Sequence, residues 1–156
     1  ADLMLETVLP WFVIGTSAMA NGLCRAAVNA TAGHLGGVCI EPQDGRLRDL
    51  PNLRARLAAM SVRTEQSRSL LAAACRQLES PNDLTPLLVL QTRLTAIEAA
   101  VEVTDLAMKA CGGAAYSKHL TIERLFRDAR AGWVMAPTAD HLHEFIGRAL
   151  TGLPLF

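Results

Sequence analysis

Apolar residues recur every three or four positions along most of this chain, which is the spacing of one face of an α-helix. The pattern predicts helical segments at about residues 3–34, 50–78, 87–111, 121–135 and 138–150. We expect Pro10 to lie in a kink or in the N-terminal turn of the first segment. Thr121 and Arg124 have a box-like spacing that suggests a cap before the fourth segment, and Thr138 or Asp140 is expected to cap the fifth.

Glycine, proline and short polar residues separate these segments. Residues 34–45 contain several glycines and a proline among polar residues, which predicts an exposed loop, and residues 80–86 predict a turn between two helices. The third helix is expected to end at Gly112 and Gly113, because glycine accepts the positive φ that commonly closes a helix.

The three longest predicted helices have roughly thirty residues each, and a helix of that length extends about 45 Å. In a chain of 156 residues such helices pack lengthwise and antiparallel through short connections. Hydrophobic residues make up 51% of the chain and aromatic residues only 4%, so small aliphatic side chains fill the interior. The sequence therefore predicts an all-α fold, an up-down four-helix bundle with an extra short C-terminal helix, in which residues 1–156 form a single domain.

Charge and cysteine usage disfavour several classes of partner and site. The chain has 15 Lys and Arg residues and 15 Asp and Glu residues, and a net charge of zero provides no field to attract nucleic acid or an anionic membrane. The sequence also lacks an apolar run long enough to span a bilayer. Its four cysteines are far apart without a CxxC pair, which argues against a zinc site and a disulfide scaffold and favours a reducing cytoplasm.

Two groups of polar residues are candidates for chemistry. His141 and His143 are two positions apart, which places them on different faces of a helix, whereas a helical metal pair needs a spacing of three or four. We interpret both as surface histidines and expect no metal. The charged run at residues 123–130 is typical of a charged helix face or of an ion-pair network between helices, with a phosphate or subunit contact as the alternative.

A series of motifs in the last third of the chain is more specific than these features. Lys109-x-x-Gly112-Gly113-x-Ala115-Tyr116 is followed after six residues by the run ERLFRDAR (123–130) and then by Thr138. In order and spacing this series resembles the QxxGGxGY, ERxxRDAR and EGT motifs in the C-terminal domain of the flavin-dependent acyl-CoA dehydrogenase family. The segments LAAM (57–60) and FIGR (145–148) resemble two further parts of that domain.

The resemblance implies that the chain is the C-terminal helical domain of a longer flavoprotein subunit, an oxidoreductase acting on the CH–CH bond of acyl-CoA thioesters in fatty acid metabolism. It also implies a homodimer or a dimer of dimers, with this domain as the oligomer core and FAD at a subunit contact. The residues expected to contact FAD are Lys109, Gly112, Gly113, Thr138 and Asp140. The two glycines would let the backbone approach the diphosphate of the cofactor.

Departures from the family pattern leave the chemistry open. The catalytic glutamate of the family precedes Gly-Thr, whereas this chain has Ala136 at that position, and a methyl group cannot accept a proton. Glu6 on the first helix is the nearest acid that could replace it. The RxFG segment that contacts FAD in the family is absent from residues 40–45. A flavin-dependent monooxygenase or oxidase of the same fold, and a non-catalytic helical assembly domain, are therefore the alternatives.

The chain begins ADLMLE, without Met and already in helical pattern, from which we expect a fragment of a longer protein. We expect this fragment alone to be inactive. The abundance of Ala, Arg and Leu indicates a bacterial source with a GC-rich genome.

Overall fold

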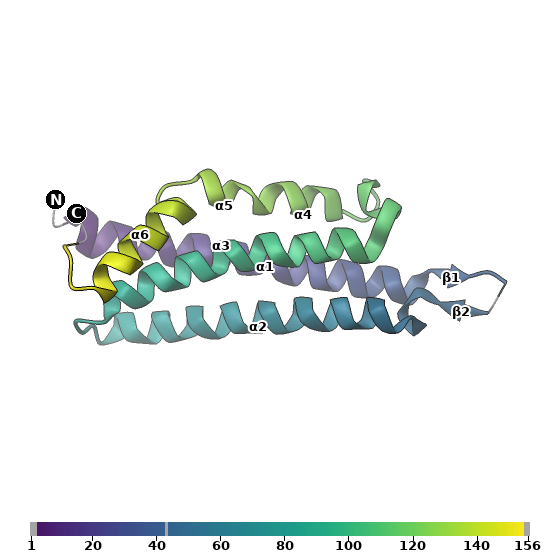
Figure 1. Cartoon of the computed structure of the whole chain (residues 1–156), viewed down its shortest axis with the longest axis horizontal. Coiled ribbons are helices and arrows are strands. Elements are labelled where there is room, and N and C mark those ends of the chain that lie inside the picture. The colour runs from purple at the N-terminus through teal and green to yellow at the C-terminus, as the bar shows by residue number, and fades with distance from the viewer. Residues whose placement is uncertain (1–2, 43, 155–156) are drawn as a thin grey trace.

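Three long helices form the body of the molecule in the computed structural model, which describes residues 3–42 and 44–154. The helices α1 (Leu9–Gly37), α2 (Pro51–Glu79) and α3 (Thr85–Cys111) lie side by side and alternate in direction along the long axis (Figure 1). Each begins with a proline in its first turn, where the missing N–H costs no hydrogen bond. Pro10 therefore lies in the predicted N-terminal turn of α1, preceded by a π-helical segment (Leu3–Val8).

The fourth position of the bundle is taken by α4 (Ile122–Ala129) and the short α5 (Ala131–Val134), which run back along α3 (Figure 1). A last helix, α6 (Ala139–Leu150), packs against α3 at the end of the bundle where α3 begins. The predicted all-α four-helix bundle with an extra C-terminal helix is confirmed.

The central helix is α3, because it packs against α1, α2, α4 and α6. Its buried face is built from small residues such as Ala100 and Ala107, which allow neighbouring helices to approach closely. Cys24 and Ala27 of α1 and Met60 of α2 are buried against this face. A core of this kind explains how the chain fills its interior with few aromatic residues.

The predicted exposed loop at residues 34–45 is wrong in two respects. The helix α1 continues to Gly37, and the strands β1 (Cys39–Ile40) and β2 (Gly45–Arg46) then pair antiparallel in a hairpin that projects from the bundle (Figure 1). Arg46 donates a hydrogen bond from Nη1 to the carbonyl of Gly36, and a short 3₁₀ helix (Leu47–Asp49) leads into α2. The bond from Arg46 joins residues ten positions apart, so the turn-forming residues of the segment did not reveal it.

The single fourth helix predicted at residues 121–135 is also wrong, because a turn at Arg130 separates α4 from α5, although Arg130 keeps helical dihedral angles. In α5, a Cβ added to Gly132 would lie 3.3 Å from Cγ1 of Ile97, so the absence of a side chain lets α5 approach α3. The cap predicted for Thr121 is not formed. Thr121 has a left-handed φ of 58° and makes no side-chain capping hydrogen bond.

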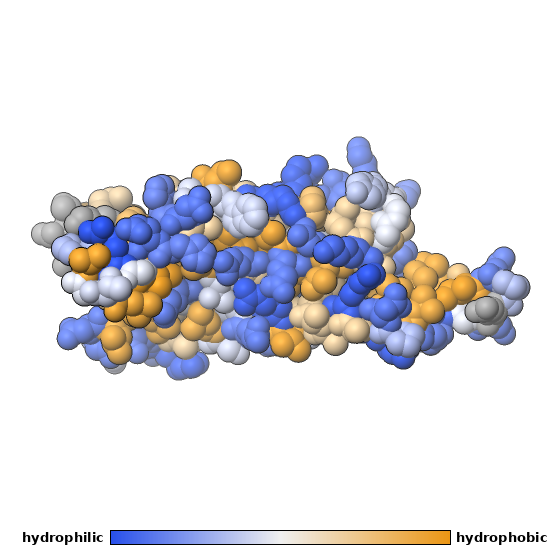
Figure 2. All heavy atoms as spheres, in the orientation of Figure 1, coloured by the Kyte–Doolittle hydropathy of each residue, from blue (hydrophilic) through white to orange (hydrophobic). Residues whose placement is uncertain are grey.

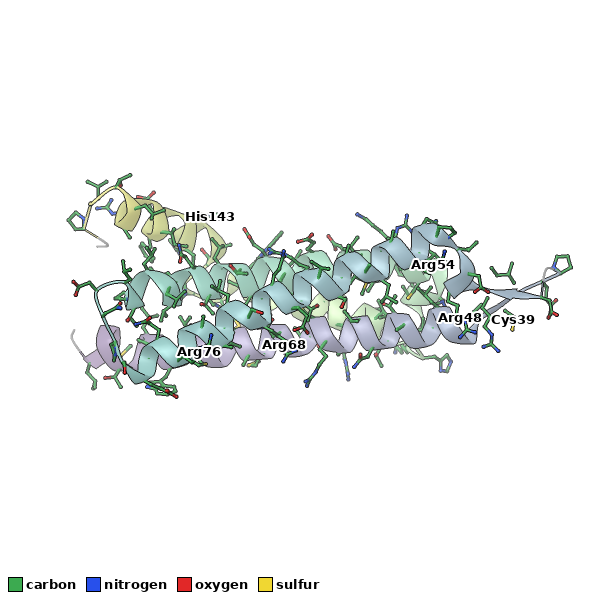
Figure 3. The ribbon with its side chains drawn as sticks, turned by 90° about the horizontal axis from the view of Figure 1, so that it is seen from below. Cys39, Arg48, Arg54, Arg68, Arg76 and His143 are labelled. Atoms are coloured by element: carbon green, nitrogen blue, oxygen red, sulfur yellow. The ribbon has the colours of Figure 1, made fainter. Side chains whose placement is uncertain are left out.

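The outer surface is largely solvated. On the face shown in Figure 2 polar and apolar groups are interspersed, with apolar atoms gathered near α6 and at the base of the hairpin. Exposed arginines, including Arg54, Arg68 and Arg76, lie along α2, and Cys39 lies on the hairpin (Figure 3). No described helix is both long enough and apolar enough to cross a membrane.

Candidate functional site

The residues predicted to contact a cofactor lie at opposite ends of α3. Gly112 and Gly113 follow its last turn, whereas Thr138 comes directly after Ala136 and Pro137, which line a cavity together with Pro86 of its first turn. At a rise of 1.5 Å per residue, the length of α3 from Val89 on the cavity wall to Gly112 is about 35 Å. One copy of the chain therefore does not bring both groups to a single point.

The glycine turn closes α3 as predicted, but only the first of its two glycines needs to be glycine. Gly112 has φ 56° and ψ −139°, and its N–H donates to the carbonyl of Met108. Gly113 does not have a positive φ. A Cβ at either glycine would meet no atom within 4 Å, so the turn presents an open backbone surface.

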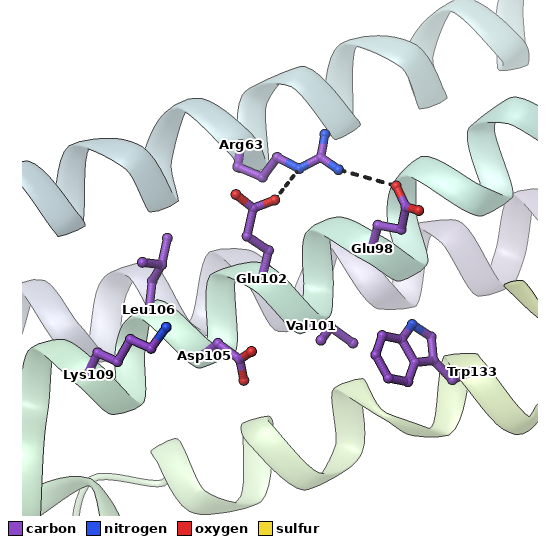
Figure 4. A pocket seen from close by; sticks show the side chains of 8 residues that line it. All are labelled: Arg63, Glu98, Val101, Glu102, Asp105, Leu106, Lys109 and Trp133. Carbon is purple, nitrogen blue, oxygen red and sulfur yellow. Dashed lines mark hydrogen bonds and ion pairs between the residues drawn. The ribbon is translucent and has the colours of Figure 1, made fainter.

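Two cationic residues lie beside this turn. Arg56 of α2 donates from Nη1 to the carbonyl of Lys109 at 2.9 Å, which offsets the partial negative charge at the C-terminal end of α3. The exposed Lys109 side chain extends back along α3 toward Asp105 (Figure 4), the direction that long helical side chains prefer. The sequence did not indicate Arg56, because it lies 53 residues from Lys109 and no local motif joins the two.

Lys109 also lines a groove of about 510 Å³ whose acidic side chains come from α3 (Figure 4). Arg63 of α2 donates from Nε to Glu102 at 2.8 Å, and its Nη2 lies 3.7 Å from a carboxylate oxygen of Glu98. Ion pairs along this groove therefore join α2 to α3. Among the described residues no three His, Cys, Asp or Glu side chains are grouped to hold a metal ion.

At the other end of α3 lies a cavity of about 760 Å³ with a mainly apolar wall. Its wall combines the start of α1, the end of α2, the start of α3 and the segment leading into α6, in particular Leu9, Pro10, Leu78, Val89, Leu90, Ala136, Pro137, His141 and Phe145. Ala136, where the motif resemblance predicts a carboxylate, thus lies on the wall of a cavity larger than the groove beside Lys109.

Among the described residues of this wall, His141 is the one with an ionisable side chain, and two neighbours hold it. Its Nδ1 lies 3.0 Å from Oγ1 of Thr138, and its ring stacks on Phe145 with centroids 6.1 Å apart and planes inclined by 16°. Thr138 also caps α6, because its Oγ1 accepts from the N–H of His141. The interpretation of His141 as a surface histidine is incomplete, since the exposed ring also lines the cavity.

Of the remaining candidate residues, Asp140 and His143, whose side chains the structure describes, do not line the cavity. Asp140 is exposed in the first turn of α6, where an acidic residue favours the helix N-terminus. His143 lies on another face of α6, and its Nε2 is 3.2 Å from Oε1 of Glu98. The side chain of Glu6 lies outside the described part of the structure, so its role as a base stays a prediction.

One charged residue is buried in the bundle itself. Arg93 of α3 is 2% exposed, its Nε and Nη2 have no hydrogen-bond partner, and burial lowers the pKa of its guanidinium. Ser17, Asn21 and Ser67 are likewise buried with unpartnered polar atoms. Buried groups of this kind are commonly satisfied by internal water.

Comparison with known proteins agrees with this geometry. The chain matches the family model described as acyl-CoA dehydrogenase, C-terminal domain, over residues 3–151. It is 28% identical over 144 residues to a 3-sulfinopropanoyl-CoA desulfinase of Paraburkholderia xenovorans, a match that covers 91% of this chain and 36% of the relative. The chain therefore spans little more than a third of that relative's length.

Solved structures share the fold. Butyryl-CoA dehydrogenase from Megasphaera elsdenii superposes with a TM-score of 0.85 at 23% identity, covering 95% of this chain and 38% of the other. PigA, solved with FAD and proline, superposes with a TM-score of 0.83 at 22% identity, covering 92% of this chain and 37% of the other. At these identities the superpositions show a common fold alone.

Proposed function

The chain belongs to the acyl-CoA dehydrogenase family, as its C-terminal domain, and we propose that it is the C-terminal third of an FAD-dependent oxidoreductase acting on the CH–CH bond of an acyl-CoA thioester. The observation that carries this proposal is the apolar cavity of about 760 Å³ on whose wall Ala136 lies, the position that the motif resemblance aligns with the family's glutamate. The relative named for a CoA thioester supports the same substrate class.

The cavity suits the hydrocarbon part of such a substrate. Its volume is in the range of small-molecule sites, and its wall offers aliphatic side chains such as Leu9, Val89 and Leu90. Each methylene of a ligand buried here would contribute about 0.8 kcal/mol to binding. Thr138 and His141 provide the polar groups beside it.

The glycine turn suits an anionic group such as the FAD diphosphate. Gly112 and Gly113 present open backbone, while Lys109 and Arg56 supply positive charge close by. When bound, FAD would supply a hydride acceptor. Thr138 and Asp140 of one copy would contact the cofactor, and the glycine turn of a neighbouring copy would contact its diphosphate. The role of this chain is to hold and orient the cofactor and to enclose the substrate.

The length of α3 from Val89 to Gly112, about 35 Å from the helix rise, supports a shared cofactor site in a homodimer or a dimer of dimers. In such an assembly the turn of one copy meets the cofactor held by its neighbour. Trp11 and Met19 of α1 are 66% and 68% exposed, and an oligomer or companion domains would bury them. We place the full-length protein in the cytoplasm of a bacterium, in fatty acid metabolism.

A flavin-dependent monooxygenase or oxidase of the same fold is the second candidate. Ala136 favours it, because oxygen chemistry on a flavin needs no abstraction of an α-proton. The fold shared with PigA, whose structure contains FAD and proline, supports this alternative.

The test is to purify the full-length protein and measure its bound cofactor. We expect a yellow protein with FAD that a panel of acyl-CoA thioesters bleaches under anaerobic conditions. A yellow protein that acyl-CoA thioesters do not bleach, but that consumes oxygen with NAD(P)H, would support the monooxygenase instead. A colourless protein that takes up no FAD would contradict both and leave an assembly domain.

A further inference from the structure

The apolar cavity beside α6 has one imidazole on its wall. Among the described residues that line it, only His141 has an ionisable side chain. The lining residues of α1, α2 and α3, such as Leu9, Leu78 and Val89, are apolar or uncharged. Imidazole is the side chain that serves most often as a general base, because its unperturbed pKa lies near the working pH.

The ring of His141 is held in a defined position. The hydroxyl oxygen of Thr138, two residues beyond Ala136, lies 3.0 Å from Nδ1 of His141. Phe145, on the next turn of α6, stacks on the ring. When Nδ1 donates its proton to Thr138, the second nitrogen, Nε2, keeps its lone pair. No described residue forms a hydrogen bond with Nε2. The arrangement is that of an oriented base, in which a second residue sets the tautomer.

His141 lies on the same cavity wall as Ala136, the position where the resemblance predicts a carboxylate. Ala136 lies shortly before the first turn of α6, which contains His141, and both residues line the one cavity. A substrate bound there would meet an inert methyl group at position 136 and a basic nitrogen on the adjoining turn.

We propose that His141 is the base that takes the α-proton of an acyl thioester bound in this cavity, in place of the carboxylate that position 136 lacks. In this step the α C–H bond breaks, an N–H bond forms at Nε2, and the electron pair remains on the thioester as its enolate. The imidazole becomes imidazolium and returns a proton when the enolate collapses. The proposal rests on the proposed function, because it needs an acyl thioester as the substrate.

Removal of the α-proton can be measured by a readout that does not depend on oxidation of the substrate. In D₂O the full-length, FAD-loaded protein should exchange the α-hydrogens of butanoyl-CoA for deuterium, detected by mass spectrometry. His141→Gln should slow this exchange about 100-fold or more, the usual contribution of a general base. His143→Gln is the matched control, because His143 pairs with Glu98 and does not line the cavity, and it should leave the rate unchanged.

Two measurements show whether His141→Gln has lost only the base or has also lost its fold or its binding site. Calorimetry should give His141→Gln an affinity for butanoyl-CoA close to that of the unmodified protein. In the unmodified protein, butanoyl-CoA should shift the imidazole NMR resonances of His141 and leave those of His143 in place. The double variant Ala136→Glu, His141→Gln should recover exchange, because it returns a carboxylate to the same wall.

The outcomes distinguish this proposal from the proposed function. A protein that binds neither FAD nor any acyl-CoA contradicts the proposed function. A protein that binds both, yet exchanges no α-hydrogen or exchanges it equally fast in His141→Gln, overturns the role of His141. Failure of Ala136→Glu to restore exchange would overturn the placement of the reacting carbon in this cavity.

Discussion

Arg130 and Asp105 form an ion pair that joins the end of α4 to the C-terminal part of α3. The guanidinium of Arg130 also lies over the ring of Phe126, with its Cζ 3.3 Å from the ring centroid, and donates to the carbonyl of that residue. The side chains of Arg130 and Asp105 are 31% and 40% exposed, so solvent weakens the attraction between them. The arginine therefore acts through packing as well as charge.

We expect Asp105→Asn to lower the free energy of unfolding by about 0.5–1 kcal/mol, the usual range for a partly exposed ion pair. Arg130→Met should cost about 1–2 kcal/mol, because it also removes the cation–π contact. Urea unfolding of the two variants and of their double variant measures the coupling. Equal costs for the two single variants would show that the ring contact contributes nothing.

The glycine turn allows a comparison of adjacent positions. Gly112→Ala should lower stability by about 1–3 kcal/mol, because φ 56° with ψ −139° is open to glycine and strained for alanine. Gly113→Ala should be close to neutral, since Gly113 lacks a positive φ and an added Cβ meets no atom within 4 Å. Thermal unfolding of both variants tests this, and a similar loss for both would contradict it.

Thr138 has a structural role that is separable from any ligand. Its hydroxyl accepts from the N–H of His141 at 3.5 Å, a long capping bond, so Thr138→Val should cost about 0.5–1 kcal/mol, at the low end for a helix cap. Amide hydrogen exchange in the first turn of α6 should accelerate in this variant. Thr138→Ser keeps the hydroxyl and should show neither change.

The docking of α6 on α3 depends on one buried leucine. Leu142 is fully buried and packs with Leu90 and Ile97. Leu142→Ala should destabilise the protein by about 2–5 kcal/mol, the range for a cavity in a packed core. Leu150→Ala on the same helix is the control, because Leu150 is 66% exposed and its loss should change stability by less than about 0.5 kcal/mol. Similar costs for the two variants in urea unfolding would show that α6 is not held by this contact.

The four cysteines should divide into two reactive and two protected thiols. Cys39 and Cys75 are exposed, whereas Cys24 and Cys111 are buried. Burial raises the pKa of Cys24 from its ordinary 9.0 to about 11 and raises that of Cys111 as well. A thiol reagent should therefore modify two cysteines in the native protein and four after unfolding, as counted by mass spectrometry.

The raised pKa of Cys24 also makes stability depend on alkaline pH. The unfolded chain loses this proton near pH 9 and the folded chain near pH 11, so the unfolded state binds fewer protons between these values. Stability is then fully present below pH 9 and falls as the pH rises toward 11. Urea unfolding at pH 8 and pH 10 should show this loss, and Cys24→Ala should reduce it.

The sequence by itself determined the helical architecture and the family, because both depend on local or regularly spaced residues. The period of apolar positions marked the three long helices, prolines such as Pro51 marked their starts, and Gly112 marked the end of α3. The motif series from Lys109 to Thr138 indicated the acyl-CoA dehydrogenase family before any packing was considered.

Only the tertiary structure decided how distant residues meet. The hairpin at residues 39–46, the break between α4 and α5 and the bond from Arg56 to Lys109 depend on contacts that no local pattern encodes. The sequence predicted His141 to be a surface histidine. Its place on a cavity wall is shared with Leu9 and Val89, which lie 132 and 52 positions before it. Residues separated in this way come together only when the helices pack, which is why the site had to be found in the fold.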